Sequence, residues 1–478
     1  MKFGTAAGHA AMKRLAVPSP VQEWIRCADG APYFETETGR SWAPVGYNDA
    51  ITWPTLAPLY RRKDPAVVEQ HFARLRDHGV TCVRLMLDYN QVRSRHLETR
   101  CGEFSRAMVQ MWDDLIALGE VYGIRFLLTP FDTFWMARRW RTHPYARANG
   151  GPSAKIEQMF TCPDTRAAIK NRLAFATRRW GHSGAIFAWD LWNEIDLNYA
   201  SGDAAAAHDF VSDISASLRN EELRLHGRSH LQTVSVFGPA LKARPALDDI
   251  VFRHPSLDFA SIHLYERSTI DNPRNTLAPA LATARLIAES ALKCPPGRPL
   301  HDSEHGPIHA FKDRHITLPD EFDSEYFRRM QWAHLASGGA GGGMRWPNRH
   351  PHVLIQGMYD AQKVLAEFLP LIDWSSFHRQ PLDARLSVHD FDGLVTGCGD
   401  TRQAVLCLMP SRAQCGKACA IDISGLEPGV YSVTQANTLT GGHESSRLQT
   451  TQDGHLNVLV HTGGQDIALA IVCADPAA

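Results

Sequence analysis

Residues 185–194 read AIFAWDLWNE, a short and mostly apolar run that ends in an amide and an acid. Amphipathic helical stretches flank this run at 167–179 and 210–225. An apolar run of this length between two helices is typical of a parallel strand that is buried on both faces. A strand followed by a helix is the repeating unit of α/β proteins.

The same alternation extends through most of the chain. Further strand-like runs stand at 43–48, 81–87, 124–129, 231–237, 258–264, 298–303 and 339–346. Further helical stretches lie between them, for example at 281–292 and 321–336. Eight strands that alternate with helices predict an α/β fold, a closed (β/α)8 TIM barrel. A doubly wound open sheet is the alternative, but its Gly-rich dinucleotide fingerprint does not follow the first strand.

The pattern divides the chain into three parts. We expect a loose, Ala-rich N-terminal tail over residues 1–20 and the barrel over 21–375, with a short hairpin that turns at Gly39 near its start. From residue 376 to 478 the helical pattern gives way to short strand runs and turns. About 100 residues of this kind predict a C-terminal antiparallel β-sandwich.

The overall charge limits the partners that the chain can have. It carries 50 Lys plus Arg and 51 Asp plus Glu in 478 residues, a net charge of −1. This balance gives no bulk attraction to nucleic acid or to an anionic membrane, so we expect neither as a partner.

The start of the chain lacks the apolar core of a secretory signal, which predicts a cytoplasmic protein, or a periplasmic or secreted one if a leader was removed. The sequence does not predict the oligomeric state.

Two of the predicted strands end in glutamates. The fourth strand ends at Glu194, and the seventh reads LHDSEHG over 300–306 with Glu304 near its end. Catalytic residues of TIM barrels lie at the carboxyl ends of the strands. The two glutamates are three strand–helix units apart, so we expect them to face one another across the top of one barrel.

The residues at these strand ends resemble a known enzyme family. Trp-Asn-Glu at 192–194, His-x-Tyr at 263–265, Glu-His-Gly at 304–306 and a Trp at 346 are similar to the retaining glycoside hydrolases of clan A, the cellulase and mannanase superfamily, and most similar to family five. The resemblance implies hydrolysis of β-linked glycosidic bonds by double displacement, with Glu194 as the general acid/base and Glu304 as the nucleophile. It implies a β-glucan, a β-mannan or a related oligosaccharide or glycoside as the substrate.

The resemblance also implies roles for residues around the glutamates. Arg84 and Tyr265 would hold the nucleophile, and Asn193 would bind the sugar 2-hydroxyl. His263 would contact the sugar or take part in the proton network, and Trp346 would form the floor under the sugar. We also group Asn48, at the end of the first strand, with the substrate-binding residues.

The third strand departs from the family pattern. It is followed by Asp132 and Trp135, where many relatives carry histidines, and we expect Asp132 to bind a sugar hydroxyl and Trp135 to stack on a sugar. Three other acids stand within a few residues of the predicted catalytic pair, and these are Asp190, Asp302 and Glu266.

Several alternatives remain open at this point. The His350-Pro351-His352 loop lacks carboxylate partners for a metal, and we expect neither a metal nor a cofactor. A transglycosylase would use the same residues, and a non-catalytic barrel that only binds glycan is a further alternative. Because Tyr431 is the one obvious aromatic residue in the later strands of the sandwich, we expect this domain to brace the barrel and not to bind carbohydrate.

Overall fold

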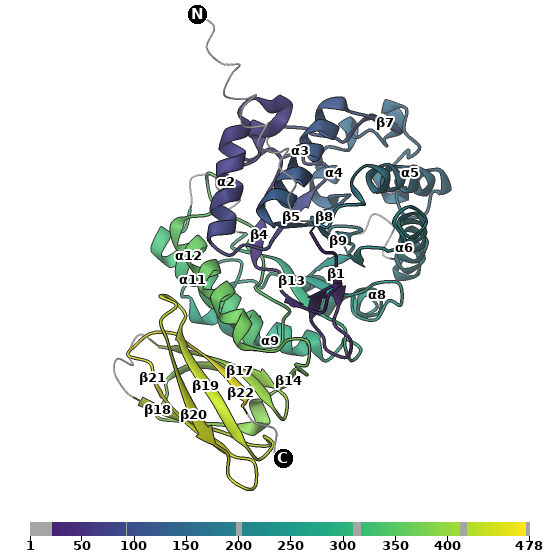
Figure 1. Cartoon of the computed structure of the whole chain (residues 1–478). Coiled ribbons are helices and arrows are strands. Elements are labelled where there is room, and N and C mark those ends of the chain that lie inside the picture. Colours follow the sequence, from purple (N-terminus) through teal and green to yellow (C-terminus); the bar gives the residue numbers. More distant parts are fainter. Residues whose placement is uncertain (1–21, 92, 197–202, 309–316, 412–417, 475–478) are drawn as a thin grey trace, which may run out of the picture.

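The computed structural model describes residues 22–91, 93–196, 203–308, 317–411 and 418–474. The tail predicted at 1–20 lies outside these residues. The part before residue 376 alternates strands with helices, and the part after it is antiparallel sheet (Figure 1). No helix among the described residues is long and apolar enough to cross a membrane.

Parallel strands occupy the centre of the larger part. They are β4 (Gly46–Asn48), β5 (Cys82–Met86), β8 (Arg125–Thr129), β9 (Ile186–Asp190), β10 (Leu231–Thr233), β11 (Ser235–Phe237), β12 (Ala260–Leu264) and β13 (Leu300–His305). One parallel sheet has the order β10-β9-β8-β5-β4, and β11-β12-β13 form another. Nearly every residue of these strands is buried, as the unbroken apolar runs predict.

The strand predicted at 339–346 is not a regular strand. Arg345 makes isolated parallel bridges to Tyr47 of β4 and to His305 of β13, so this segment lies between the first and last of the strands. Gly341 has a φ of 81°, and a Cβ there would lie 2.3 Å from the carbonyl oxygen of Pro44. The segment still bonds to β13, since the N–H groups of Ala340, Met344 and Trp346 donate to the carbonyl oxygens of Leu300, Asp302 and His305. Glycine permits the close backbone approach between these bonds.

Helices surround the parallel strands. They are α2 (Pro65–Asp77), α3 (Arg106–Tyr122), α4 (Thr133–Arg138), α5 (Pro163–Trp180), α6 (Ala204–His226), α7 (Gly238–Ala243), α8 (Leu247–Val251), α9 (Leu277–Ala291), α11 (Asp320–Ala336) and α12 (Gln356–Phe368). A 3-10 helix, η1 (Ala57–Arg62), precedes α2. The Asp203 side chain caps the first turn of α6, and Gly227 ends this helix with a φ of 70°.

Short antiparallel strands precede β4 and follow β5 in the chain. They are β1 (Ile25–Cys27), β2 (Phe34–Thr36) and β3 (Ser41–Trp42), and a second pair is β6 (Glu98–Arg100) and β7 (Glu103–Phe104). The hairpin predicted to turn at Gly39 is confirmed, since β2 pairs with β3 and Gly39 has a φ of 82°.

The C-terminal part contains two antiparallel sheets. Their strands are β14 (Gln380–Pro381), β15 (Leu386–His389), β16 (Gly393–Gly399), β17 (Gln403–Pro410), β18 (Ala418–Ile423), β19 (Val430–Asn437), β20 (His443–Gln449), β21 (Leu456–His461) and β22 (Ile467–Cys473). One sheet has the order β14-β16-β17-β22-β19-β20, and the other has the order β15-β18-β21. Apolar side chains from both sheets form one buried cluster.

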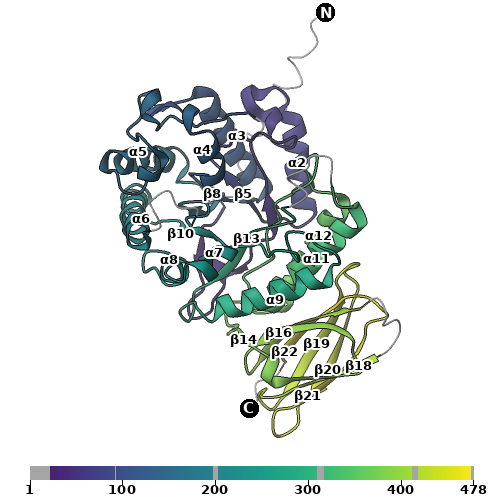
Figure 2. The same cartoon turned by 180° about the vertical axis from the view of Figure 1, so that it is seen from behind.

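The two parts share a hydrophobic cluster. Trp332 of α11 belongs to the same cluster as Cys407 and Met409 of β17. Arg329 of α11 makes two hydrogen bonds with the Asp466 carboxylate, at 2.9 and 2.8 Å, and Arg328 makes a third at 3.1 Å. The antiparallel sheets therefore pack against α9 and α11, as both views show (Figures 1 and 2).

Candidate active site

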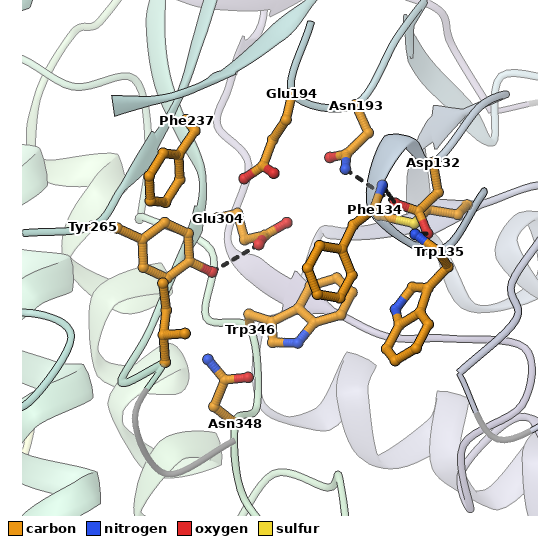
Figure 3. A pocket seen from close by; sticks show the side chains of 12 residues that line it. Asp132, Phe134, Trp135, Asn193, Glu194, Phe237, Tyr265, Glu304, Trp346 and Asn348 are labelled. Carbon is orange, nitrogen blue, oxygen red and sulfur yellow. Dashed lines mark hydrogen bonds between the residues drawn. The ribbon is translucent and has the colours of Figure 1, made fainter. Parts of the chain in front are cut away.

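Glu194 and Glu304 come together at the carboxyl ends of the parallel strands. Glu304 lies in β13, and Glu194 follows β9. One oxygen of each carboxylate and a ring nitrogen of His263 all lie within 4.8 Å of one another. Both carboxylates point into the same pocket (Figure 3).

The backbone holds Glu194 in an unusual conformation. Its φ is 50°, in the left-handed region that costs a residue with a Cβ about 1–2 kcal/mol. Its N–H donates to Ser235 Oγ at 3.1 Å, and the next N–H, of Ile195, donates to the Ser235 carbonyl at 2.9 Å. These bonds to β11 offset the cost of a conformation that turns the carboxylate into the pocket.

A cation and a hydroxyl group donate hydrogen bonds to the Glu304 carboxylate. Arg84 Nη1 donates to Glu304 Oε2 at 2.9 Å, and the Tyr265 hydroxyl donates to Oε1 at 2.7 Å. Burial raises the pKa of Glu304, while His263 and Arg84 oppose this shift. The negative form of Glu304 is therefore stabilised by direct contacts even though it is buried.

Among the described residues, Glu194 forms no ion pair with a lysine or an arginine. Its Oε1 lies 2.9 Å from Nδ1 of His263, and burial raises the pKa of Glu194 to about 7, with Arg84 opposing and Asp190 adding to the shift. Burial also lowers the pKa of His263 to about 4, so its ring is neutral near pH 7. Of the two glutamates, Glu194 is the one whose surroundings favour the protonated form.

Arg84 is the centre of a buried polar network. Besides Glu304, its guanidinium donates to Asp190 Oδ2 at 2.8 Å, to Asn193 Oδ1 at 2.6 Å and to Asn48 Oδ1 at 3.0 Å. The predicted contact between Arg84 and the Glu304 side chain is thus present. The hydrogen bond from Arg84 also fixes the amide orientation of Asn193, whose Nδ2 donates to Asp132 Oδ1 at 3.2 Å.

The structure does not bring Asn48 to the pocket. Asn48 is fully buried, its Oδ1 accepts from Arg84, and its Nδ2 donates to the backbone carbonyl of Ser303 at 2.9 Å. A side chain with no exposed surface and with its polar groups already bonded cannot contact a sugar. The grouping of Asn48 with the substrate-binding residues is therefore wrong, and its place is behind Arg84.

The pocket in front of the two glutamates has a volume of about 290 Å³. Five of its twelve lining residues are aromatic, and Asp132, Asn193 and Asn348 add polar groups. The rings are those of Phe134, Trp135, Phe237, Tyr265 and Trp346 (Figure 3). A concave, aromatic-rich pocket with a few convergent polar groups is typical of a small-molecule or sugar site.

Asp132 and Trp135 both line this pocket, at the start of α4. Asp132 caps the helix by accepting from the N–H groups of Phe134 and Trp135, both at 3.1 Å. Burial raises the pKa of Asp132 to about 7 against these two hydrogen bonds. The cap therefore holds the Asp132 carboxyl and the two rings of α4 in fixed places on one wall of the pocket.

Comparison with solved structures shows which fold this is. A glycoside hydrolase family 5 structure from Bacteroides vulgatus matches with a TM-score of 0.65 at 12% identity, over 96% of this chain and 95% of that chain. The chain has the fold of glycoside hydrolase family 5. No family model matches the chain. No curated protein matches its sequence.

Two of the other matching structures are mannosidases. A family 5 mannosidase from Rhizomucor miehei, in complex with mannosyl-fructose, matches with a TM-score of 0.55 at 12% identity, over 73% of this chain and 97% of that chain. An exo-β-1,4-mannosidase from an Opitutaceae bacterium matches with a TM-score of 0.51 at 18% identity, over 67% of this chain and 54% of that chain.

The other acids near the strand ends do not line the pocket. Asp190 is fully buried and bonded to Arg84 and Ser235, and Asp302 is fully buried and bonded to the His305 ring at 2.7 Å. Glu266 forms ion pairs with Arg285 and Lys242. In the family 5 fold of this chain, these three acids therefore bond to neighbouring side chains and stabilise the structure around the pocket.

Sequence reasoning missed several residues of the pocket and its support. Phe237 and Asn348 line the pocket, and Phe237 is the last residue of a predicted strand, so the strand-end rule could have identified it. Ser235 bonds both Asp190 Oδ2, at 3.0 Å, and the Glu194 N–H. No sequence pattern distinguishes this serine from any other polar residue in a strand.

Two groups of side chains have a composition that could suit a metal ion. In the first, Glu194, His263 and Glu304 already bond to one another or to Arg84 and Tyr265. In the second, both oxygens of Asp88 pair with Arg172, and Nδ1 of His143 accepts from the Tyr145 N–H. Because of that bond, the neutral His143 ring carries its proton on Nε2, which removes the lone pair that a metal would need.

Proposed function

We propose that the chain is a retaining glycoside hydrolase that cleaves β-linked glycosidic bonds. The observation that carries the proposal is the approach of Glu194 and Glu304 to within 4.8 Å, measured between one oxygen of each. Retaining enzymes hold their two carboxyl groups ~5–5.5 Å apart, whereas inverting enzymes leave ~6.5–9.5 Å for a water molecule. The spacing supports double displacement.

The two environments support different roles for the glutamates. Glu304, bonded to Arg84 and Tyr265, would attack the anomeric carbon as a carboxylate. Glu194, with its pKa raised to about 7, would give its proton to the leaving oxygen. Once Glu304 is esterified its negative charge is gone, so Glu194 ionises more easily and can take a proton from the attacking water.

The architecture supports the same assignment. We propose that β4, β5, β8, β9, β10 with β11, β12, β13 and the segment at Arg345 form a closed (β/α)8 barrel, because Arg345 bridges both β4 and β13. We further propose that residues 376–474 form a β-sandwich that braces it. The solved mannosidases with this fold favour a β-mannan or a related β-linked glycan as the substrate.

The test combines two variants with product analysis. Glu304→Ala should abolish turnover of an aryl β-mannoside or β-glucoside, and azide should restore it with an inverted product. Glu194→Ala should slow turnover severely but keep the activity toward a good aryl leaving group, which needs less protonation. Glu266→Ala, which removes an ion-paired carboxylate outside the pocket, is the matched control. Unchanged activity in either catalytic variant would reject the roles.

Transglycosylation and simple glycan binding are the alternatives. Both predicted catalytic carboxylates are present and line one pocket, which disfavours a barrel that only binds glycan. A transglycosylase would use the same two glutamates. Product analysis with and without an added alcohol or sugar acceptor separates hydrolysis from transfer.

A further inference from the structure

A second pocket, of about 470 Å³, lies beside the first on the same end of the fold. Residues 51–63, which follow β4, form one wall, and Arg93 and Arg95, which follow β5, form the other. Both walls come from the carboxyl ends of parallel strands, as Glu194 and Glu304 do. The second pocket therefore opens on the face that carries the candidate active site.

Trp53 and Tyr89 form an aromatic layer that links residues of the two pockets. Trp53 is fully buried, and its ring contacts Trp346 of the first pocket with centroids 5.1 Å apart. The neighbours of Trp53 in the chain, Thr52 and Pro54, line the second pocket. The backbone of Arg95 exchanges two hydrogen bonds with Tyr89, both 3.0 Å long, and the ring of Tyr89 lies 6.1 Å from Trp346.

The charged groups of this pocket are all positive. Of the residues that the structure describes, Lys63, Arg93 and Arg95 line it, and no acidic residue does. Among the residues that the structure describes, none of these three cations forms an ion pair, and neither does Arg61. The nearest acid in the sequence is Asp64, which is exposed and makes no capping hydrogen bond. A concave site lined by one sign of charge concentrates the potential that attracts an anion.

An aromatic ring contacts Arg95 of the pocket and the neighbouring Arg61. The Arg95 guanidinium lies 3.9 Å from the ring centroid of Tyr60, and the Arg61 guanidinium lies 5.4 Å from the same centroid. Burial lowers the pKa of Arg95, Tyr60 opposes this shift, and Arg93 and Arg61 add to it. Several positive side chains thus lie close together, and no acidic side chain among the described residues neutralises them. This arrangement is expected of a site whose bound ligand supplies the negative charge.

We propose that this basic pocket binds the sulfate or carboxylate groups of an acidic glycan. The glycan is favoured over other polyanions because the pocket adjoins, across the Trp53 and Tyr89 layer, a pocket whose aromatic lining suits sugar rings. The inference rests on the proposed function and adds an acidic substituent to the proposed substrate. The binding itself does not require cleavage, so it can be tested separately.

The experiment uses the full chain and a matched pair of probes. Dextran sulfate and dextran share one α-linked backbone, which is not a β-glycoside, and differ only in their sulfate groups. Affinity is measured for the wild type and for two double variants. The pocket variant combines Lys63→Ala with Arg93→Ala. The control variant combines Arg100→Ala with Arg447→Ala and removes two exposed arginines elsewhere. We expect wild type to bind dextran sulfate but not dextran, the pocket variant to bind about tenfold more weakly, and the control to match wild type.

Three outcomes would overturn the proposal. They are equal affinity of the pocket and control variants, displacement of dextran sulfate by free sodium sulfate at the same sulfate concentration, and equal affinity for single-stranded DNA of matched charge. The first means non-specific attraction, the second a site for small anions, and the third a general polyanion site. Glu304→Ala should bind dextran sulfate as wild type does, so failure of the catalytic assignment and failure of this one are distinguishable.

Discussion

Arg84 Nη1 lies 2.9 Å from Glu304 Oε2, and the whole Arg84 side chain is buried. This contact is what makes the two glutamates chemically different. Both carboxylates are buried in one pocket, but the cation bonds only one of them, while the other contacts a neutral histidine. The proposed division into a nucleophile and a proton donor therefore depends on which carboxylate Arg84 contacts.

Replacement of Arg84 should remove activity even when the charge is kept. Arg84→Lys cannot supply the separate Nη1 and Nη2 donors that reach Glu304, Asp190 and Asn193, so kcat/KM should fall by about 100-fold or more. The measurement is steady-state kinetics on an aryl β-glycoside. The control is Arg125→Lys, which alters a cation at the first residue of β8, at the end of the strand away from the pocket. A lysine variant within threefold of wild type would contradict the network.

Loss of the Tyr265 hydroxyl should slow the reaction without unfolding the protein. Tyr265→Phe keeps the ring in the pocket wall but removes the 2.7 Å hydrogen bond to Glu304. A hydrogen bond to a charged group is worth about 1.5–3 kcal/mol, so kcat should fall by about 10- to 100-fold. Tyr431→Phe removes a buried hydroxyl from the C-terminal sheets instead. It should lower stability and leave kcat unchanged, and equal kinetic effects of the two variants would reject the role of Tyr265.

The pH dependence should be bell-shaped. Glu304 must be ionised to attack, and its pKa is raised, so activity should appear at a pH above that of an ordinary glutamate. Glu194 must be protonated to donate, and its pKa is raised to about 7, so activity should fall as the pH rises through about 7. The measurement is kcat/KM of the wild type across the pH range.

Asp132 offers a competing explanation for the alkaline limb, because its pKa is also raised to about 7. With an activated aryl glycoside, Glu194→Ala should lose the alkaline limb, whereas Asp132→Asn should keep it. The reverse pattern would assign the limb to Asp132.

The strand ends were predictable because the parallel part of the chain repeats one simple strand–helix unit. Apolar runs separated by amphipathic helices gave the positions of the strands, and the position at a strand end gave Glu194 and Glu304, while Tyr265 came from the resemblance to family five. The eighth segment was harder, since its glycines have no side chains to show a strand pattern and are selected by close backbone contacts instead. Such contacts are between elements far apart in the chain and leave no local signal.

Residues that act through other residues were the ones misjudged or missed. Asn48 stands at a strand end as a ligand-binding residue would, but its neighbours use all of its hydrogen-bonding groups. Ser235 supports both Asp190 and Glu194, and the basic pocket joins residues 51–63 to Arg93 and Arg95. Only the folded arrangement brings these partners together.

The part with parallel strands and the antiparallel sheets should unfold together, because a buried ion pair and a hydrophobic cluster join them. Asp466 is buried and bonded to Arg328 and Arg329, and the hydrophobic cluster beside it contains residues of both parts. Asp466→Ala leaves Arg328 buried without its anion and leaves Arg329 with Glu325 as its remaining ion-pair partner, which should destabilise the chain by roughly 3–5 kcal/mol. Denaturant unfolding followed by circular dichroism and by tryptophan fluorescence measures this loss. Asp453→Ala removes an aspartate that is 77% exposed and should change little. If Asp466→Ala unfolds the antiparallel sheets in a separate, earlier transition while the part with parallel strands keeps wild-type stability, the sheets do not brace that part.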